Sequence, residues 1–395
     1  MPETINTIPF ARPFIGKEEE EAVLRVLRSG WLTTGAEALA FEKEFGEFLK
    51  MPDFKCLAVN SATSGLHLAA EACGIEKGDL VFLPSLTFTA TAEVVRYLGA
   101  DPVFVDVKPG TFHMDPNALE YAIENNKMAG KPKAVIPVHY NGLPCDMGAI
   151  MSIARKYGLK VIEDAAHSFP SVMENGDRAG TIGDVGVFSF YANKTITTGE
   201  GGMVVTENDE IAKRISVMRS HGIDRSVWSR YTDLKSSWYY EVLEAGYKYN
   251  LPDILAALGR VQLTRAWDLL KMRQEIAAAY DAAFGSGKNF IVPPTGAGDA
   301  RHLYPLRLEP SSLKISRDEF IEKLKQNGIG VSVHYIPLHV MPFYKNRYNL
   351  KEDDFPETMK AYRHEISLPI WPGMTKLQIT QVIDTVKSIA AEYAG

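Results

Sequence analysis

The chain has 395 residues, of which 46% are hydrophobic and 23% charged, and this composition is typical of an ordinary soluble globular protein with two or three domains. Its net charge of −6 without a basic stripe argues against a nucleic-acid partner, and three widely spaced cysteines without a CxxC pair argue against a metal site. Because there is no signal-peptide core and no run approaching the ~18 apolar residues of a membrane span, we expect a cytoplasmic protein without a membrane partner.

The first half of the chain alternates between short apolar segments and helical patterns. Residues 18–29 have the pattern of an amphipathic helix, which Gly30 is placed to cap at its C-terminus. Predicted strands follow at 56–59, 80–84, 102–107, 134–138, 159–162, 185–190 and 203–206, and predicted helices lie between several of them at 65–72, 90–98, 119–125 and 147–157. Near-continuous apolar strands separated by helices indicate an α/β domain with a mostly parallel sheet covered on both faces.

The alternation stops after residue 206. Helices are predicted at 208–220, 251–284, 316–327 and 375–393, and strands at 302–308 and 330–335. These elements predict a smaller α+β unit at the C-terminus. We therefore divide the chain into a large domain, 1–265, and a small C-terminal domain, 266–395.

Lys194 is the most informative residue of the sequence. It follows the apolar strand 185–190 and precedes a glycine-rich turn, and partial desolvation at the end of a sheet would lower its pKa and make its amine nucleophilic. Asp164 lies two residues after the strand 159–162. Alone, a lysine is usually solvated and such an aspartate usually caps a helix. Together, an aldehyde-binding amine and a carboxylate for a ring nitrogen are what pyridoxal phosphate chemistry requires, so we interpret the protein as an enzyme.

Hydroxyl residues near the same sheet edge could bind the cofactor phosphate. Thr63 and Ser64 lie where the strand 56–59 leads into a helix, whose N-terminal amides attract anions. The alternative is that they are ordinary helix caps. Ser189, five residues before Lys194, is a further candidate for the phosphate.

Two aromatic side chains can each be interpreted as cofactor contacts or as core residues. Phe88 follows the strand 80–84 and either stacks on a flat cofactor ring or packs in the core. His167, three residues after Asp164, either contacts the phenolic oxygen of the ring or is a core histidine.

Taken together, these segments resemble the DegT/DnrJ/StrS family of sugar aminotransferases, which have the type I fold of pyridoxal phosphate enzymes. The resemblance covers nearly the whole chain. Its segments are Gly30-Trp-Leu-Thr-Thr-Gly35, Ser61-Ala-Thr-Ser-Gly65, Pro84-Ser-Leu-Thr-Phe88, Glu163-Asp-Ala-Ala-His167, Ser189-Phe-Tyr-Ala-Asn-Lys194, Gly199-Glu-Gly-Gly202, Gly246-Tyr-Lys-Tyr-Asn250, His334-Tyr-Ile-Pro-Leu-His339 and Ser367-Leu-Pro-Ile-Trp-Pro-Gly373. The segments Gly30–Gly35 and Gly246–Asn250 look most like the branch that makes UDP-linked 4-amino-4-deoxyarabinose.

The resemblance implies a role for each cofactor-binding residue. Lys194 would bond the cofactor aldehyde and act as acid and base. The ring would be held by Asp164 at the pyridine nitrogen, His167 at the phenolic oxygen and Phe88 on one face. The phosphate would be bound by Thr63, Ser64 and Ser189, together with Asn250 from a partner subunit, which makes the expected active unit a homodimer with shared active sites.

The resemblance also implies the substrates. An amino group would pass from an amino acid, with L-glutamate as the expected donor, to a keto group of a nucleotide-linked deoxysugar, with a 4-keto sugar as the expected acceptor. The amino sugar would enter cell-surface polysaccharide or lipopolysaccharide. The nucleotide-sugar side of the site would be lined by Trp31, Thr33, His334, Tyr335 and His339.

Three alternatives remain at the level of sequence. The dehydratase branch of the family carries histidine where this chain has Lys194, which argues against that chemistry. A non-nucleotide cyclic ketone could be the acceptor. A catalytically idle domain with a regulatory function is the third possibility, although Asp164 and Lys194 are both present.

Overall fold

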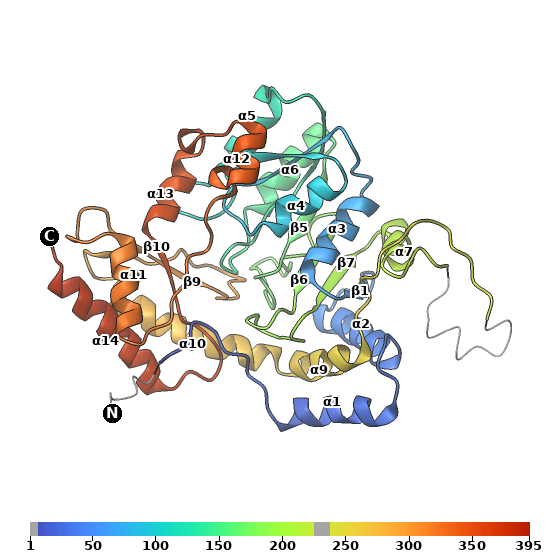
Figure 1. The fold of residues 1–395 in the computed structure, drawn as a ribbon, viewed down its shortest axis with the longest axis horizontal. Helices are drawn as coiled ribbons and strands as arrows, with labels where there is room; N and C mark the ends of the chain where they lie inside the picture. The colour runs from blue at the N-terminus through green and yellow to red at the C-terminus, as the bar shows by residue number, and fades with distance from the viewer. Residues whose placement is uncertain (1–6, 225–237) are drawn as a thin grey trace.

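A seven-stranded sheet forms the centre of the computed structural model, which describes residues 7–224 and 238–395 (Figure 1). The strand order is β1-β7-β6-β5-β4-β2-β3. All strands run parallel except β7, which pairs antiparallel with both β1 and β6. The strands are β1 (Lys55–Val59), β2 (Asp79–Pro84), β3 (Asp101–Val105), β4 (Lys131–Val135), β5 (Lys160–Asp164), β6 (Val185–Ser189) and β7 (Gly202–Thr206). The predicted mostly parallel sheet is confirmed.

Helices cover both faces of this sheet. Alternate strand residues point to opposite faces, so Val187 packs in one apolar cluster and its neighbour Phe188 in another. The Val187 face is covered by α3 (Ala62–Ala72), α4 (Ala90–Tyr97) and α7 (Asp209–Met218). The opposite face is covered by α2 (Ala36–Leu49), α5 (Pro116–Asn125), α6 (Met147–Tyr157) and α9 (Asp253–Thr264). The preceding helix, α1 (Lys17–Ser29), packs against α9 and ends as predicted at Gly30, whose φ is 75°.

The C-terminal part forms a second, antiparallel sheet of order β10-β9-β8. Its strands are β8 (Phe290–Ile291), β9 (Tyr304–Leu308) and β10 (Glu365–Leu368), and its helices are α10 (Ala266–Phe284), α11 (Arg317–Gln326), α12 (Pro342–Tyr348), α13 (Pro356–His364) and α14 (Lys376–Glu392), with short 3-10 turns at Leu338–Val340 and Glu352–Asp354. A capping box begins α11, because Ser316 and Glu319 each accept the other's backbone N–H.

Helix α10 connects the two parts of the molecule, and in Figure 1 it continues the line of α9 towards the second sheet. Its first turn packs Ala266 and Leu269 into the apolar cluster of the large sheet, whereas Tyr280 and Phe284 pack into the cluster of the second sheet. Ile8, from the opposite end of the chain, belongs to that second cluster as well. The division at residues 265 and 266 stays a prediction.

Two predicted elements were wrong. The helix predicted at 251–284 is two helices, because Arg265 leaves helical geometry between α9 and α10. The strand predicted at 330–335 is a single β-bridge between Ser332 and Ser367, after which the chain turns towards the sheet edge described below. None of the described helices is long and apolar enough to cross a membrane.

Candidate active site

A cavity of about 450 Å³ lies where the parallel strands of the large sheet end. Asp164 is the last residue of β5, Ser189 is the last residue of β6, and Thr63 lies in the first turn of α3, after β1. Carboxyl ends of parallel strands meet at one edge of a sheet, which is why residues far apart in sequence converge there. The lining includes Ser61, Thr63, Thr87, Phe88, Val138, Asp164, Ala166, His167, Ser189, Tyr191, Asn193, Lys194, Glu200, His334 and Tyr335.

The amine of Lys194 is desolvated although the side chain retains some contact with the open cavity. Burial lowers its pKa to about 7, the carboxylate of Asp164 opposes that shift, and the positive charge of Arg273 adds to it. Its described hydrogen-bond partner is Nε2 of His302, 3.5 Å from Nζ. A substantial fraction of this amine is therefore neutral, and nucleophilic, at neutral pH.

Asp164 is held in a fixed orientation by Thr91 of α4 and by the backbone of Ala166. It is 6% exposed, its Oδ2 accepts a hydrogen bond from the Thr91 hydroxyl at 2.9 Å, and its Oδ1 accepts from the backbone N–H of Ala166 at 3.2 Å. Thr87 and Thr91 are 2.8 Å apart through their hydroxyls, and since Thr91 donates to Asp164, it accepts from Thr87. Burial raises the pKa of Asp164, whereas the Thr91 bond and Lys194 lower it.

His167 is neutral, and its hydrogen bonds identify the tautomer. Its Nδ1 contacts the carbonyl oxygen of Tyr140, which can only accept, so Nδ1 carries the proton. Nε2 is then an acceptor for the hydroxyl of Tyr335 at 3.3 Å. Burial and the charge of Lys194 keep the pKa of His167 well below its ordinary value.

The mouth of the cavity is aromatic. Phe88 is 54% exposed, although its ring lies 5.6 Å from that of Tyr335. His334 is anchored behind them, with Nδ1 at 2.8 Å from the Ser367 hydroxyl and its backbone N–H donating to Glu365 at 3.1 Å. An exposed phenylalanine at a cavity mouth offers a flat apolar face to a planar ligand.

The sequence matches the model of the DegT/DnrJ/EryC1/StrS aminotransferase family over residues 13–387. The chain belongs to this family. It is 42% identical over 385 residues to the spore coat polysaccharide biosynthesis protein SpsC of Bacillus subtilis, covering 97% of each chain. Two solved structures are also similar. Spr1654 of Streptococcus pneumoniae, described as a sugar aminotransferase, matches in its PMP form with a TM-score of 0.89 and 31% identity, covering 98% of this chain and 99% of Spr1654. Helicobacter pylori PseC, an aminotransferase of pseudoaminic acid biosynthesis, matches with a TM-score of 0.88 and 29% identity, covering 98% of this chain and 100% of PseC.

The family membership confirms the fold type I architecture and a pyridoxal phosphate-dependent sugar aminotransferase. Spr1654 has also been solved in its PLP form. The cavity of this aminotransferase fits the cofactor, because an amine of lowered pKa and an oriented carboxylate share one space with an aromatic face. Asn193 also lines this cavity, and its buried Oδ1 has no hydrogen-bond partner among the described residues.

Two predicted residues lie outside the cavity lining. The hydroxyl of Ser64 faces Asn60 Oδ1 at 2.7 Å and the Ser61 carbonyl at 2.8 Å, so it serves the cap of α3, and Ser61 lines the cavity instead. His339 is buried against Ser85 and the ring of Phe355.

Three further predicted residues lie together at another place on the aminotransferase. Asn250 donates from Nδ2 to the Thr34 hydroxyl at 2.6 Å. The neighbouring Thr33 is exposed and accepts from the Asp253 N–H at 3.3 Å through its carbonyl. Trp31 packs close to Gly35, in the same loop. None of the three is among the described residues that line the cavity of their own chain.

Sequence reasoning missed Thr91, His302 and Arg273, which act on the predicted residues. Thr91 orients Asp164, His302 contacts Lys194, and Arg273 changes the pKa of Lys194. No motif spacing relates them to the residues they contact. His302 fell in a segment interpreted only as a strand.

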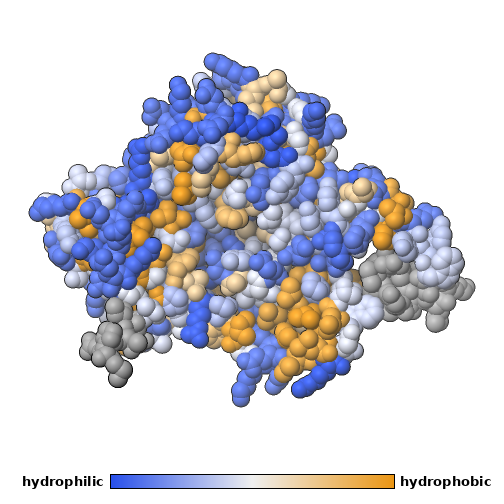
Figure 2. All heavy atoms as spheres, viewed as in Figure 1, coloured by the Kyte–Doolittle hydropathy of each residue, from blue (hydrophilic) through white to orange (hydrophobic). Residues whose placement is uncertain are grey.

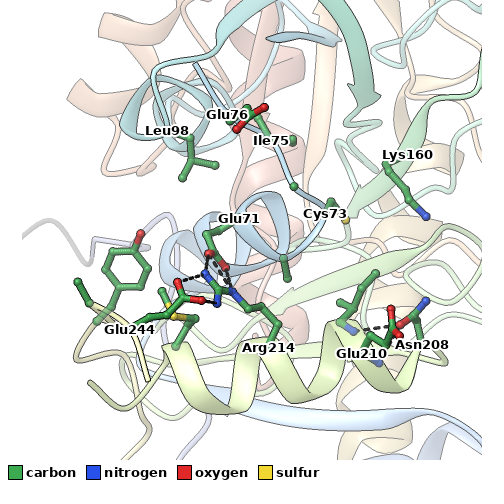
Figure 3. Close-up of a pocket in the computed structure, with 16 residues that line it drawn as sticks. Glu71, Cys73, Ile75, Glu76, Leu98, Lys160, Asn208, Glu210, Arg214 and Glu244 are labelled. Carbon is green, nitrogen blue, oxygen red and sulfur yellow. Dashed lines mark hydrogen bonds and ion pairs between the residues drawn. The ribbon is translucent and has the colours of Figure 1, made fainter. Parts of the chain in front are cut away.

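A second pocket, of about 830 Å³, lies between α3 and α7 (Figure 3). Its arginine, Arg214, points at Glu71 on one side and Glu244 on the other, with Nε 3.0 Å from Glu71 and Nη2 2.8 Å from Glu244. Two carboxylates flank one guanidinium there, and none of the predicted site residues lines this pocket. The smaller cavity is therefore the candidate active site.

Proposed function

We propose that this aminotransferase moves an amino group from L-glutamate to the keto group of a nucleotide-linked 4-keto deoxysugar, for the synthesis of a cell-surface polysaccharide or lipopolysaccharide. The observation that carries the proposal is the pairing of Lys194, with its pKa lowered to about 7, and Asp164 in one cavity. The names of SpsC and PseC place two similar proteins in polysaccharide and pseudoaminic acid biosynthesis.

The cavity residues divide the chemistry among them. Bound pyridoxal phosphate supplies an aldehyde that bonds amines and a ring that accepts an electron pair. Nζ of Lys194 takes up and returns a proton, which a pKa near 7 allows at neutral pH. Oδ1 and Oδ2 of Asp164, oriented by Thr91, hold a proton on a ring nitrogen. In the net reaction the amino acid becomes an oxoacid and the keto sugar becomes an amino sugar.

Other residues bind and orient. Thr63, Ser61 and Ser189 lie at the helix and strand ends where a phosphate group is favoured by backbone N–H groups. Phe88 would cover one face of the cofactor ring, and His167, whose neutral Nε2 lies beside Tyr335, would offer it a polar edge. His334 and Tyr335 line the side at which the sugar enters.

We also propose that the active unit is a cytoplasmic homodimer with shared sites, in which Asn250, Trp31 and Thr33 of one subunit complete the cavity of the other. Figure 2 supports this, because hydrophobic residues gather at the lower edge of the molecule, near α1. The exposed apolar side chains of α1 and its following loop are Leu24, Leu27 and Leu32. An exposed apolar patch of this kind favours association.

A spectroscopic titration tests the proposed reaction. Purified protein loaded with pyridoxal phosphate should lose its visible cofactor band on addition of glutamate, and one sugar from a panel should restore it. The panel contains UDP-, GDP- and dTDP-linked 4-keto-6-deoxysugars and a UDP-linked 4-keto pentose. The Lys194→Ala variant should bind cofactor without turnover.

Each outcome decides a different part of the proposal. Restoration by one nucleotide sugar identifies the acceptor. Bleaching by glutamate without restoration by any panel sugar, but with restoration by a free cyclic ketone, would replace the nucleotide sugar by a non-nucleotide ketone. Turnover by Lys194→Ala at the wild-type rate would refute the assignment of Lys194.

A further inference from the structure

Arg273 is a buried cation beside the candidate active site. It lies in the middle of α10, and its side chain is 1% exposed, among the largest fully buried side chains of the molecule. Burial without a carboxylate lowers the pKa of the guanidinium. Arginine nevertheless stays protonated in proteins, so a positive charge is kept in the interior. Such a charge is costly unless its donors are satisfied.

The two Nη groups of Arg273 donate to main-chain carbonyl oxygens in three separate segments, whereas its buried Nε has no hydrogen-bond partner among the described residues. Nη2 donates to the carbonyl of Asn193 at 2.9 Å. Nη1 donates to the carbonyls of His302 at 3.1 Å and Ile370 at 2.8 Å. No ion pair of Arg273 with a carboxylate occurs within residues 7–224 and 238–395. The planar fork of five N–H groups suits this arrangement, whereas a lysine could satisfy fewer of the carbonyls.

Two of these segments contain the groups that meet at the reactive amine. Asn193 directly precedes Lys194 in the chain, and His302 places Nε2 3.5 Å from Lys194 Nζ. The ring of His302 also packs 4.3 Å from that of His167. The third segment, at Ile370, follows β10 and belongs to the apolar cluster of the second sheet. Arg273 therefore joins both sides of the Lys194–His302 contact to the C-terminal part of the molecule.

We propose that Arg273 is a positioning residue, which holds Lys194 and His302 at their contact distance by binding the carbonyls of Asn193, His302 and Ile370. Arg273 is not among the described residues that line the cavity, and it acts through the backbone. Its charge has a second effect, because a buried cation near the amine favours the neutral form of Lys194. The ionisable side chains that interact with Lys194 are Asp164, His167, Arg273, His302 and His334.

Three variants separate the charge of Arg273 from its hydrogen bonds. Arg273→Lys keeps the charge with three N–H donors in place of five, and Arg273→Gln loses the charge and keeps only two donors. Lys271→Gln is the matched control, because it removes a positive charge from the same helix at an exposed position two residues away. The reactivity of Lys194 towards an amine-selective reagent is measured against pH in the full chain freed of cofactor, together with the melting temperature of each variant.

The expected results differ among the variants. In the wild type, labelling of Lys194 should rise with a midpoint about 7, and Lys271→Gln should leave it there. Arg273→Gln should move the midpoint to higher pH, and Arg273→Lys should move it less. With cofactor, both Arg273 variants should lower kcat on the order of tenfold to a hundredfold, since displacement of a reactive group by about 1 Å has effects of this size.

A merely structural role would give another pattern. Variants that melt at lower temperature but keep the wild-type labelling midpoint and kcat would overturn the proposal. The inference rests on Lys194 being the reactive lysine of the proposed function, and Lys194→Ala tests that point separately. If Lys194→Ala keeps full turnover, the proposed function fails, whereas an unchanged midpoint together with an unchanged kcat in Arg273→Gln refutes only the positioning role.

Discussion

At the scale of single residues, Lys194 lies between charges of opposite effect. Asp164 favours its protonated form, and Arg273 and burial favour its neutral form, with burial the largest influence. The amine therefore has a lower pKa in the folded protein than the 10.5 of an exposed lysine. Proton binding to Lys194 and folding are consequently linked, because the unfolded chain binds this proton more tightly than the folded one.

We expect Lys194→Met to stabilise the cofactor-free protein at neutral pH. Between pH values of about 7 and 10.5 the unfolded chain binds more protons at this position, so wild-type stability rises with pH through that window. At pH 7 and below, the methionine variant should be more stable by on the order of 1–3 kcal/mol, which is less than the full pKa shift implies because cavity water screens the amine. This advantage should shrink towards pH 10.5. Denaturant unfolding at several pH values measures it, with Lys271→Met as the exposed control; a constant difference at all pH values would contradict the linkage.

Thr91 makes a second residue-scale prediction. Its hydroxyl bond lowers the pKa of Asp164, which burial raises. Thr91→Val removes that bond while keeping the side-chain shape, so the pKa of Asp164 should rise. Because Asp164 must be ionised to hold a ring proton, the acidic limb of kcat/KM should move to higher pH by about half a unit to one unit. Thr89→Val, on the same helix end, is the control; equal pH profiles for wild type and Thr91→Val would sink this role.

Residues at strand ends were predictable, and residues that contact them across the fold were not. Asp164, Ser189 and Lys194 follow apolar strands, and parallel strands place such residues on one sheet edge. His302 and Arg273 reach the same place from other segments. Their positions depend on how the second sheet packs against α10, which no local pattern encodes.

At the scale of elements, the start of α3 contains a capping residue outside the cavity lining, Ser64, a lining residue, Thr63, and one residue with both roles, Ser61. Ser61 and Ser64 cap the helix reciprocally, because Ser64 N donates to Ser61 Oγ at 3.1 Å and Ser61 N donates to Ser64 Oγ at 3.2 Å. Thr63, between them, lines the cavity. In this turn the neighbouring hydroxyls of Thr63 and Ser64 therefore have different roles.

This difference predicts opposite effects for two neighbouring substitutions. Ser64→Ala should lower the free energy of unfolding by about 1 kcal/mol, the usual cost of a lost cap, with little change in cofactor affinity. Thr63→Ala should leave stability nearly unchanged and weaken binding of pyridoxal phosphate. Denaturant unfolding and a cofactor titration measure the two effects on each variant. Weaker cofactor binding in Ser64→Ala than in Thr63→Ala would show that Ser64 is the phosphate ligand.

Sequence patterns located most elements but not their interruptions. Apolar periodicity runs from 251 to 284 without a break, because both α9 and α10 turn an apolar side towards the core, yet Arg265 leaves helical geometry between them. The extended segment after Gly330 has the alternation of a strand. Among the described residues of this segment only Ser332 forms a β-bridge, to Ser367 on the free edge of β10, because the chain then leads His334 and Tyr335 into the cavity.

At the scale of the whole molecule, the residues proposed to bind the sugar, together with the proposed phosphate ligand Asn250, occupy two places. His334 and Tyr335 line the cavity, whereas Trp31, Thr33 and Asn250 lie beside Thr34 at the start of α2. The side chain of Asn250 is anchored there through Nδ2, and its Oδ1 has no hydrogen-bond partner among the described residues. A homodimer would reconcile the two places, because each subunit would supply the missing half of the other's site.

Mixed dimers test this arrangement. Lys194→Ala and Asn250→Ala homodimers should each lose most activity, since every site contains a substituted residue. If Asn250 acts across the interface, a heterodimer of the two variants has one site with both substitutions and one with neither. Mixing the variants under conditions that exchange subunits should then restore up to about a quarter of wild-type activity per subunit, because about half of randomly paired dimers are mixed and each has one intact site.

The alternative geometry gives a different result from the same mixture. If Asn250 served the cavity of its own chain, every site in a mixed dimer would still contain one substituted residue, and mixing would restore nothing. A Lys194→Ala and Asp164→Asn mixture is the control, because both residues lie in one cavity of one chain and complementation is impossible. Restoration in the first mixture alone would establish a shared site, and its absence in a confirmed mixed dimer would assign Asn250 to its own subunit.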